Sequence, residues 1–327
     1  MTRKSVAIIG AGLSGITLAN LIKKKFDVKI FEKSRGVGGR MSTRKEPPFI
    51  FDHGAQFFKI KTIEFSNFCA ELFEQKVIRP WNFNLAYFEG NNLEKIRVIK
   101  KKDKYFVGVP NMNSIVKYLS KNCDVVLNTK IESVIKRSKK WYLCDQSKRL
   151  YGGYDWLILT LPAEQTLELT PKSLSFYSLV ESIKMKAVYS VMIGMNESLN
   201  LKYDAALIQN KDIAWLAINN SKPCRHCKYS LLVNSSFKYA AKNISVSKEK
   251  VLKHLLNVTS RFIKSRLSNS RVVKIHKWRY VEAEKSPVQN YYLNQDSQIA
   301  VCGDWLINSR VEGAFISASQ LSEKIME

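Results

Sequence analysis

The stretch Val6–Arg40, "VAIIGAGLSGITLANLIKKKFDVKIFEKSRGVGGR", decides the fold of this chain. An apolar, β-branched run ends in the glycine-rich turn "GAGLSG", and apolar residues then recur at helical spacing through "LSGITLANLIKKK". The run "FDVKIFE" follows as a second strand. A strand, a glycine turn, a helix and a strand within about thirty residues predict a βαβ unit of the dinucleotide-binding type.

The three glycines of this turn, Gly10, Gly12 and Gly15, have the spacing G-x-G-x-x-G. The first glycine permits a tight turn, the second lets the backbone approach a pyrophosphate, and the third lets the helix pack closely on the strand. The helix start offers unpaired N–H groups and the positive end of its dipole to a phosphate. Glu32, at the end of the second strand, can accept hydrogen bonds from both hydroxyls of an adenosine ribose. The turn is therefore predicted to hold the ADP part of NAD or FAD.

A second glycine-rich loop, "KSRGVGGRMST", places Gly39 and Arg40 just beyond Glu32. A domain that binds only NAD has little need of such a loop. FAD binds in an extended form, and a second loop can cover its phosphates and lead toward the flavin ring. The segment "FDHGAQFF" follows and places Gln56 between apolar neighbours, but this segment alone fits a loop before a core strand equally well.

The carboxy-terminal part of the chain again shows a predicted buried strand, a glycine and a predicted helix. "QIAVCGD" is predicted as a buried strand closed by Gly303 and Asp304, and "EGAFISASQLSEKI" as a helix that begins near Glu312. Small residues in its first turn let a planar ring lie against the helix start, where the dipole stabilises negative charge on a reduced flavin. Asp304 is expected to bond a ribityl hydroxyl. This segment is therefore predicted to hold the flavin end of FAD.

The predicted fold class is α/β, a Rossmann-like FAD-binding domain with an inserted substrate domain of antiparallel sheet and helices. The chain has 327 residues, of which 45% are hydrophobic, enough for one large core or two interleaved domains. The FAD-binding domain is predicted to be discontinuous, with residues 1–60, 105–165 and 280–327. Residues 61–104 and 166–279 are predicted to form the substrate domain, and substrate is expected to enter where the two meet.

The net charge of +25 raises the question of a nucleic-acid partner. The lysines come in short clusters along the chain, and no recognised nucleic-acid module accompanies them. We therefore expect a solvated basic surface that helps to gather an anionic substrate, and no specific nucleic-acid binding. No apolar run is long enough to span a bilayer, and the glycine-broken run near the amino terminus is not expected to be an export signal.

Six cysteines are scattered along the chain, and only Cys224 and Cys227, in "PCRHC", have a chemically suggestive spacing. A zinc site would need a second pair of ligands at a suitable distance, so no metal site is predicted. A redox dithiol would usually have a βα context, which is missing here. We expect a surface loop with two free thiols, in a reducing compartment, and hence a cytoplasmic protein.

No catalytic triad is expected, because a flavin itself accepts the hydride and the protein supplies geometry and electrostatics. His276, Trp278 and Tyr280 alternate along the predicted strand "HKWRYV" and so face one side. That stripe is either a core seam or the wall of the substrate cavity, and we favour the wall. His53 either touches substrate or caps a turn. The candidate catalytic residues are His276, Trp278, Tyr280 and Gln56.

Together these segments resemble the flavoprotein superfamily of amine oxidases, phytoene desaturases and protoporphyrinogen oxidases. Within it the chain looks like the renalases, on "FDHGAQFF" soon after "GGRMSTR", on "VGVPNMNSIVKYL" and on "HKWRYVEAEKSP". The resemblance covers the flavin-binding segments and is thin between residues 165 and 270. It implies noncovalent FAD, since the cysteinyl attachment of some amine oxidases has no clear counterpart. With the helix start added, the expected FAD contacts are Gly10, Gly12, Leu13, Ser14, Gly15, Glu32, Lys33, Gly39, Arg40, Met41, Ala55, Gln56, Phe57, Ile131, Gly303, Asp304, Glu312, Gly313 and Ala314.

The resemblance to renalases also implies an activity. These enzymes oxidise the misreduced isomers 2- or 6-dihydro-NAD(P) by hydride transfer to the flavin and pass the electrons to molecular oxygen, which gives hydrogen peroxide. Such a substrate is an anionic dinucleotide, which the basic charge suits. Two alternatives stay open: a flavin amine oxidase acting on a small amine, and a catalytically silent flavoprotein that serves as a sensor or scaffold. The oligomeric state is not predicted.

Overall fold

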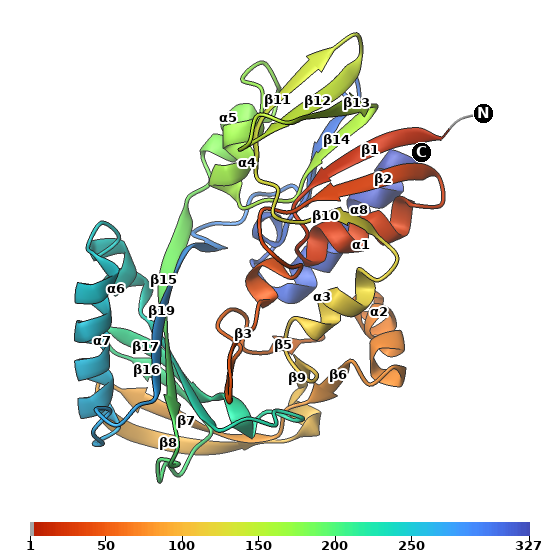
Figure 1. Cartoon of the computed structure of the whole chain (residues 1–327). Coiled ribbons are helices and arrows are strands. Elements are labelled where there is room, and N and C mark those ends of the chain that lie inside the picture. The colour runs from red at the N-terminus through yellow and green to blue at the C-terminus, as the bar shows by residue number, and fades with distance from the viewer. Residues whose placement is uncertain (1–2) are drawn as a thin grey trace.

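The computed structural model describes residues 3–327 and is organised around two large sheets (Figure 1). The first is a six-stranded sheet in the order β10-β2-β1-β14-β21-β20. Its strands are β1 (Lys4–Ile9), β2 (Phe26–Phe31), β10 (Asp124–Val126), β14 (Trp156–Leu159), β20 (Tyr292–Asn294) and β21 (Ile299–Val301). All its neighbours pair in parallel except β20 and β21.

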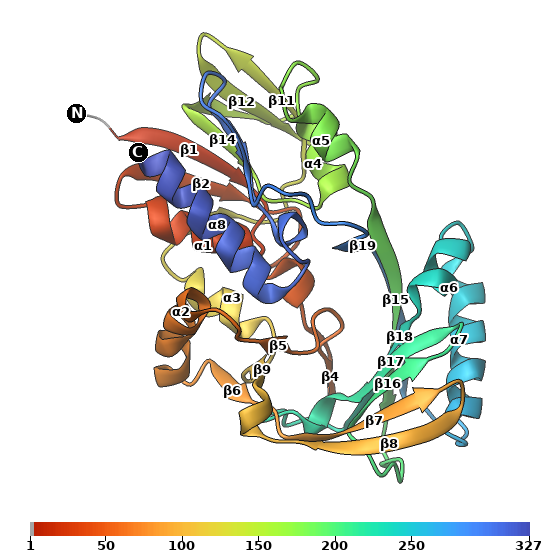
Figure 2. The same cartoon turned by 180° about the vertical axis from the view of Figure 1, so that it is seen from behind.

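Alternating residues of β1 point to opposite faces of this sheet, and both faces are buried. Val6 and Ile8 pack with the helices α1 (Leu13–Ile22) and α8 (Val311–Met326), which lie side by side (Figure 2). Ala7 and Ile9 pack on the other face. That face is covered by β11 (Ile131–Arg137), β12 (Lys140–Asp145), β13 (Leu150–Tyr154), α4 (Ala163–Leu169) and α5 (Tyr177–Glu181). Because both faces are covered, the central strands are apolar throughout.

The run "DVV" belongs to the six-stranded sheet and not to the meander that follows it in the chain. Residues Asp124–Val126 are β10, which pairs in parallel with β2 at the edge of the six-stranded sheet. The meander consists of β11, β12 and β13 alone. The apolar pair Val125 and Val126 extends the sheet beside Ile30 and Phe31, which explains why this short run leaves the meander.

The second sheet has seven strands in the order β19-β15-β18-β17-β16-β7-β8. They are β7 (Phe83–Glu89), β8 (Asn92–Ile99), β15 (Met185–Met195), β16 (Ala205–Gln209), β17 (Ile213–Ile218), β18 (Tyr229–Ser235) and β19 (Val272–Ala283). All pairs are antiparallel except β16 with β7. The antiparallel sheet predicted as part of the fold class is thereby confirmed.

Helices cover only one face of the seven-stranded sheet. Tyr189, Val191 and Ile193 of β15 pack with α6 (Phe237–Lys242) and α7 (Lys248–Phe262), whose buried residues recur at helical spacing. On the opposite face, Met192 packs with Phe49 and Phe51, which lie beside the first sheet's loops. The face without helices is therefore turned toward the dinucleotide-binding unit.

Shorter elements join the two parts. They are the hairpin β3 (Arg44–Glu46) and β4 (Phe49–Phe51), the small sheet β5 (Phe58–Lys59), β9 (Tyr105–Gly108) and β6 (Ile78–Pro80), the helices α2 (Ile63–Glu74) and α3 (Ser114–Leu119), and the 3-10 turns η1 (Gly39–Met41), η2 (Lys101–Asp103), η3 (Asn219–Ser221) and η4 (Asp304–Leu306). Phe65 and Phe68 of α2 pack on Phe315 of α8. This helix, from a segment assigned to the substrate domain, thus lies against the dinucleotide-binding unit. The division into domains remains a prediction.

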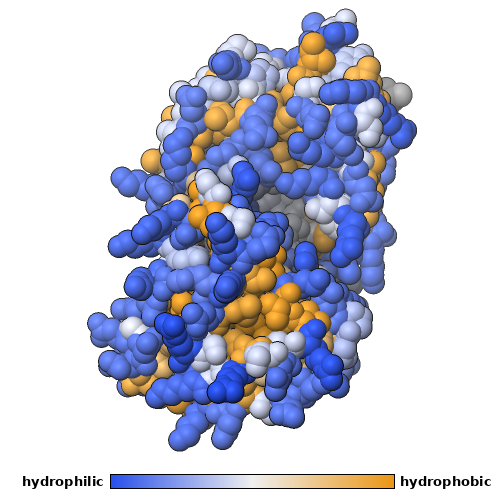
Figure 3. Space-filling model, turned by 60° about the vertical axis from the view of Figure 1, so that its left-hand side comes forward, coloured by the Kyte–Doolittle hydropathy of each residue, from blue (hydrophilic) through white to orange (hydrophobic). Residues whose placement is uncertain are grey.

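The predicted fold class is confirmed: a parallel Rossmann-like sheet stands beside a separate, mainly antiparallel sheet. The face drawn in Figure 3 is mostly hydrophilic, with its broadest apolar patch in the lower half and smaller apolar areas in the upper half. None of the helices within residues 3–327 combines the length and the apolar character needed to cross a bilayer.

Candidate functional site

The glycine turn is built as its spacing predicts. Gly10 has φ +111°, and a Cβ there would lie 2.7 Å from Thr160 Oγ1. A Cβ at Gly15 would overlap the carbonyl oxygen of Gly10. A Cβ at Gly12, by contrast, would meet nothing within 4 Å. The space in front of Gly12 is therefore open, as approach of a pyrophosphate requires.

The backbone N–H donors at the start of α1 are not used by side chains and are left for a pyrophosphate. The helix begins at Leu13, with Ser14 next, and its N-cap Gly12 supplies no side-chain hydrogen bond. No acidic side chain lies in the first turn. The positive end of the helix dipole is thus left uncompensated by side chains, which fits a phosphate ligand.

Glu32 stands over the same turn at the carboxyl end of β2. It is buried, and its Oε2 accepts from Ala11 N at 2.9 Å while its Oε1 accepts from Ser34 N at 2.8 Å. The carboxylate is thus fixed where a ribose hydroxyl would be expected. Ile131 is buried beside this strand end, whereas Lys33 is exposed.

The second glycine loop lies on the first. Gly38 N donates to Ala11 O at 3.0 Å, and a Cβ at Gly39 would lie 3.4 Å from Gly12 Cα. Arg40 then reaches the carboxy-terminal segment, since its Nη2 donates to Asp304 Oδ1 at 2.5 Å. Segments more than 260 residues apart therefore meet through one arginine.

A third segment, Gly54–Phe57, joins at the same place. Ala55 N donates to Arg40 O at 2.8 Å, and a Cβ at Gly54 would overlap that oxygen. Met41, the next residue of the arginine loop, is buried. Phe57 extends toward the seven-stranded sheet, with its ring 5.8 Å from that of Trp215 on β17. The predicted contacts from three distant segments are therefore neighbours in space.

Residues at the start of α8 that were predicted to contact FAD also make close contacts within the protein. Gly303 N donates to Ser317 Oγ at 2.9 Å, and Gly313 is packed so closely that a Cβ would lie 2.6 Å from Asn308 Oδ1. Ala314 is buried. Glu312 Oε1 accepts from both the backbone N (2.7 Å) and the Oγ1 (2.8 Å) of Thr62. One oxygen of this predicted FAD contact thus secures the start of α2.

Two residues of the predicted aromatic stripe pack on His53. The rings of His276 and His53 lie 5.1 Å apart, and that of Trp278 stacks on His53 at 5.3 Å. Trp278 Nε1 also donates to His53 O at 2.8 Å. Tyr280 lies farther along β19, where burial and then the charges of Glu164 and Glu168 raise its pKa. The structure therefore joins His276 and Trp278 with His53, which we name the imidazole wall, and leaves Tyr280 toward α4.

Both imidazoles of this wall are neutral at pH 7. Burial, then His276 and Arg44, lower the pKa of His53 to about 4. Burial, then Arg44 and Lys248, lower the pKa of His276 to about 4. The positive charge of Arg44 acts on both rings, so the field at the imidazole wall disfavours a cation.

These pKa values predict that the protein loses stability as the pH falls from about 6.5 to about 4. The unfolded chain takes up protons at both histidines in this window and the folded chain does not, so protonation favours unfolding. For His53 alone the loss is up to about 3 kcal/mol. Denaturant unfolding at pH 7 and pH 4.5 measures it, and His53→Gln should reduce the drop. A drop in stability that His53→Gln leaves unchanged would contradict the assignment.

A fully buried ion cluster beside the imidazole wall was missed by the sequence analysis. The side chains of Asp52, Lys222 and Arg225 have no exposed surface. Asp52 Oδ2 accepts from Arg225 Nη2 at 2.7 Å and from Lys222 Nζ at 3.3 Å. Oδ1 accepts from Thr43 Oγ1 at 2.6 Å and from Met112 N at 3.0 Å. Burial alone raises the pKa of Asp52, but these partners outweigh it and lower the pKa to about 2.

The "PCRHC" segment is therefore not the surface loop that we expected. Its two thiols are free and half-buried, but Arg225 between them is buried against Asp52. The available signal was Asp52 itself, because a carboxylate inside the apolar run "FIFDHGAQFF" needs a buried partner.

Gln56 is held by the same cluster. Its Nε2 donates to the backbone oxygens of Asp52 and Gly54, at 2.5 and 3.0 Å, and its Oε1 accepts from Lys222 Nζ at 3.3 Å. The side-chain amide is thus used within its own loop. This geometry favours a role in shaping the loop over the catalytic contact predicted for Gln56.

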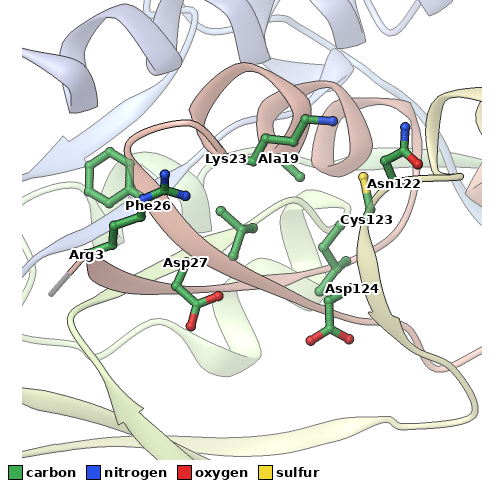
Figure 4. A pocket seen from close by; sticks show the side chains of 10 residues that line it. Arg3, Ala19, Lys23, Phe26, Asp27, Asn122, Cys123 and Asp124 are labelled. Carbon is green, nitrogen blue, oxygen red and sulfur yellow. The ribbon is translucent and has the colours of Figure 1, made fainter.

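A separate surface cavity of about 350 Å³ lies at the other end of the six-stranded sheet (Figure 4). Phe26 and Asp27 at the start of β2 line it together with Asp124 at the start of β10. Ligands of parallel sheets bind at the carboxyl ends of the strands, where Gly12 and Glu32 lie. This cavity is therefore distinct from the candidate site.

Comparisons with known proteins agree with this geometry. Residues 8–72 match the model of the NAD(P)-binding Rossmann-like domain. The chain is 24% identical to renalase of Mus musculus over 307 residues, which cover 86% of each protein. A shorter match, 48% identical over 50 residues, relates it to a 4,4'-diapophytoene desaturase of Staphylococcus haemolyticus and covers 15% of this chain and 10% of that protein.

Solved structures extend the likeness in fold to nearly the whole chain. A structure assigned as a protoporphyrinogen oxidase of Exiguobacterium aligns with a TM-score of 0.80 at 11% identity, over 99% of both chains. Putrescine oxidase bound to putrescine aligns with a TM-score of 0.72 at 12% identity, again over 99% of both chains. The resemblance inferred from the motifs is confirmed: the chain is similar in sequence to renalase and shares its fold with the protoporphyrinogen oxidase and putrescine oxidase structures.

Proposed function

We propose that this protein oxidises 2- or 6-dihydro isomers of NAD(P) on a noncovalently bound FAD, with molecular oxygen as the acceptor. The substrate would lose a hydride and become the ordinary oxidised nicotinamide. Oxygen would take up two electrons and two protons to give hydrogen peroxide. The observation that carries the choice of substrate is the imidazole wall itself, where burial, aided by the charge of Arg44, keeps both histidines neutral and disfavours a cation.

The residues present fit FAD at each part of its length. The open space before Gly12 and the uncapped start of α1 suit the pyrophosphate, and Glu32 suits the ribose. Asp304 and the start of α8 lie at the far end, joined to the turn through Arg40. Bound there, FAD supplies hydride acceptance and electron transfer to oxygen. Burial raises the pKa of the Cys302 thiol, which favours its neutral form and supports noncovalent binding.

The imidazole wall would orient the substrate and would not exchange a proton with it. Trp278 and Ser190 both donate to His53 O, at 2.8 and 3.0 Å, so the wall is fixed to β15 and β19. The neutral rings, of which that of His53 is buried, would help to exclude water from the bound substrate. The phosphates of a dinucleotide would be attracted by basic surroundings, whereas a protonated amine would be repelled by the positive charge of Arg44.

Anaerobic mixing tests this proposal. The holoprotein should lose its flavin absorbance rapidly with 2- or 6-dihydro-NAD(P), and readmitted oxygen should restore the colour with one hydrogen peroxide per substrate. Ordinary NADH serves as the control. Rapid bleaching by a benzylic amine or a polyamine would instead identify an amine oxidase. Bleaching by none of these would contradict the proposal and favour a sensor or scaffold.

A further inference from the structure

We propose that Lys222 is a positioning residue of the flavin site, whose buried ammonium shapes the Gly54–Phe57 segment and stabilises the reduced flavin by its charge. This inference rests on the proposed binding of FAD. It concerns a residue from the thinly matched part of the chain, beside the "PCRHC" segment.

The ammonium of Lys222 is completely enclosed. Its Nζ donates to Asp52 Oδ2 at 3.3 Å, to Gln56 Oε1 at 3.3 Å and to Asn219 Oδ1 at 3.2 Å. The ring of Trp81 lies beneath it, 5.4 Å from its centroid. Three acceptors satisfy its three protons, so the group has a fixed position and a fixed direction.

The charges around it do not balance. Asp52 carries one negative charge, and both Lys222 and Arg225 direct their cations at the same Oδ2 atom. A buried cluster with an unpaired positive charge is costly unless an anion shares its surroundings. Burial, opposed by Asp52 and aided to a smaller extent by the charge of Arg225, lowers the pKa of Lys222 to about 8.

A short chain of hydrogen bonds, with one peptide link between Ala55 and Gln56, connects this charge to the candidate site. Lys222 holds the amide of Gln56, whose neighbour Ala55 donates to Arg40 O at 2.8 Å. Arg40 in turn contacts Asp304. Reduction places negative charge on the flavin, and a buried cation one loop away lowers the free energy of that form, since interior charges are weakly screened. The unbalanced cluster thus gains its missing anion when the flavin is reduced.

The test compares flavin potentials in purified holoproteins. Lys222→Met removes the charge and leaves Asp52 balanced by Arg225, so the fold should persist. The solution potential is fixed at pH 7, with a redox dye as the reference, at the midpoint potential of the unsubstituted protein. At this potential the ratio of reduced to oxidised flavin should be at least about threefold lower in Lys222→Met than in the unsubstituted protein. Lys222→Arg should retain the ratio. The matched control Lys29→Met removes the same charge from an exposed position on β2 and should change nothing.

The pH dependence gives a second readout. The difference between the unsubstituted protein and Lys222→Arg should open as the pH rises through about 8, because lysine loses its charge there and arginine does not. This readout also decides the matter if Lys222→Met does not fold. Equal potentials in all flavin-loaded variants, with no such divergence, would overturn the inference and leave the proposed function intact. Failure of the unsubstituted protein to bind flavin would instead overturn the proposed function.

Discussion

Gly12→Val should fold but emerge from purification colourless. The added side chain fills open space, since a Cβ at Gly12 meets nothing within 4 Å, so the fold bears little strain. The same space is where the pyrophosphate approaches the start of α1, and three extra carbons exclude it. The flavin-to-protein ratio should drop below about one tenth of the unsubstituted value, since lost phosphate contacts exceed about 1.4 kcal/mol.

A control separates loss of binding from loss of folding. Gly15→Ala should lower stability instead, because its Cβ overlaps the Gly10 carbonyl. Absorbance at the flavin bands and circular dichroism measure both effects. A yellow, stoichiometric Gly12→Val protein would show that the turn is misassigned.

Asp52→Asn should destabilise the fold by about 3–5 kcal/mol, because it leaves two buried cations facing a neutral amide. Asp52 is the only carboxylate that pairs with Lys222 or Arg225 among residues 3–327. The loss also frees the segment that carries Gln56, so flavin retention should weaken with stability. Denaturant unfolding at pH 7 measures the change.

An exposed ion pair provides the matched comparison. Asp124 pairs with Lys29 at 3.3 Å on the surface, and Asp124→Asn should cost less than about 1 kcal/mol. Adding Lys222→Met to Asp52→Asn should recover part of the loss, since it removes one of the two unpaired cations. A change below about 0.5 kcal/mol in Asp52→Asn would contradict the buried cluster.

The parts of this protein that depend on local periodicity were predictable from the sequence. The glycine turn, the long helix α7 and the strands β15, β17 and β18 each carry their pattern within a few neighbouring residues. The contact between Arg40 and Asp304 was also predictable, because the segment of Arg40 was predicted to lie along the phosphates of FAD and the segment of Asp304 to hold its flavin end. The resemblance supplied the remaining FAD contacts, which stay predictions.

The buried cluster was not predictable in the same way. Asp52 and Arg225 are 173 residues apart, and neither neighbourhood indicates the other. The run "PCRHC" has the composition of an exposed loop, and only tertiary packing makes its arginine an interior group. Likewise, alternation placed Tyr280 with His276, but the pairing of β19 with β15 shifts register between Lys186 and Val188 and separates them.

The central claim is that three distant segments, around Gly12, Arg40 and Asp304, bind one FAD molecule. Reconstitution tests it most directly: the purified chain is mixed with excess FAD, passed through a desalting column and denatured, and the released flavin is quantified against protein. We expect one FAD per chain, released without covalent residue on the polypeptide. A chain that is folded by circular dichroism and retains no flavin would contradict it.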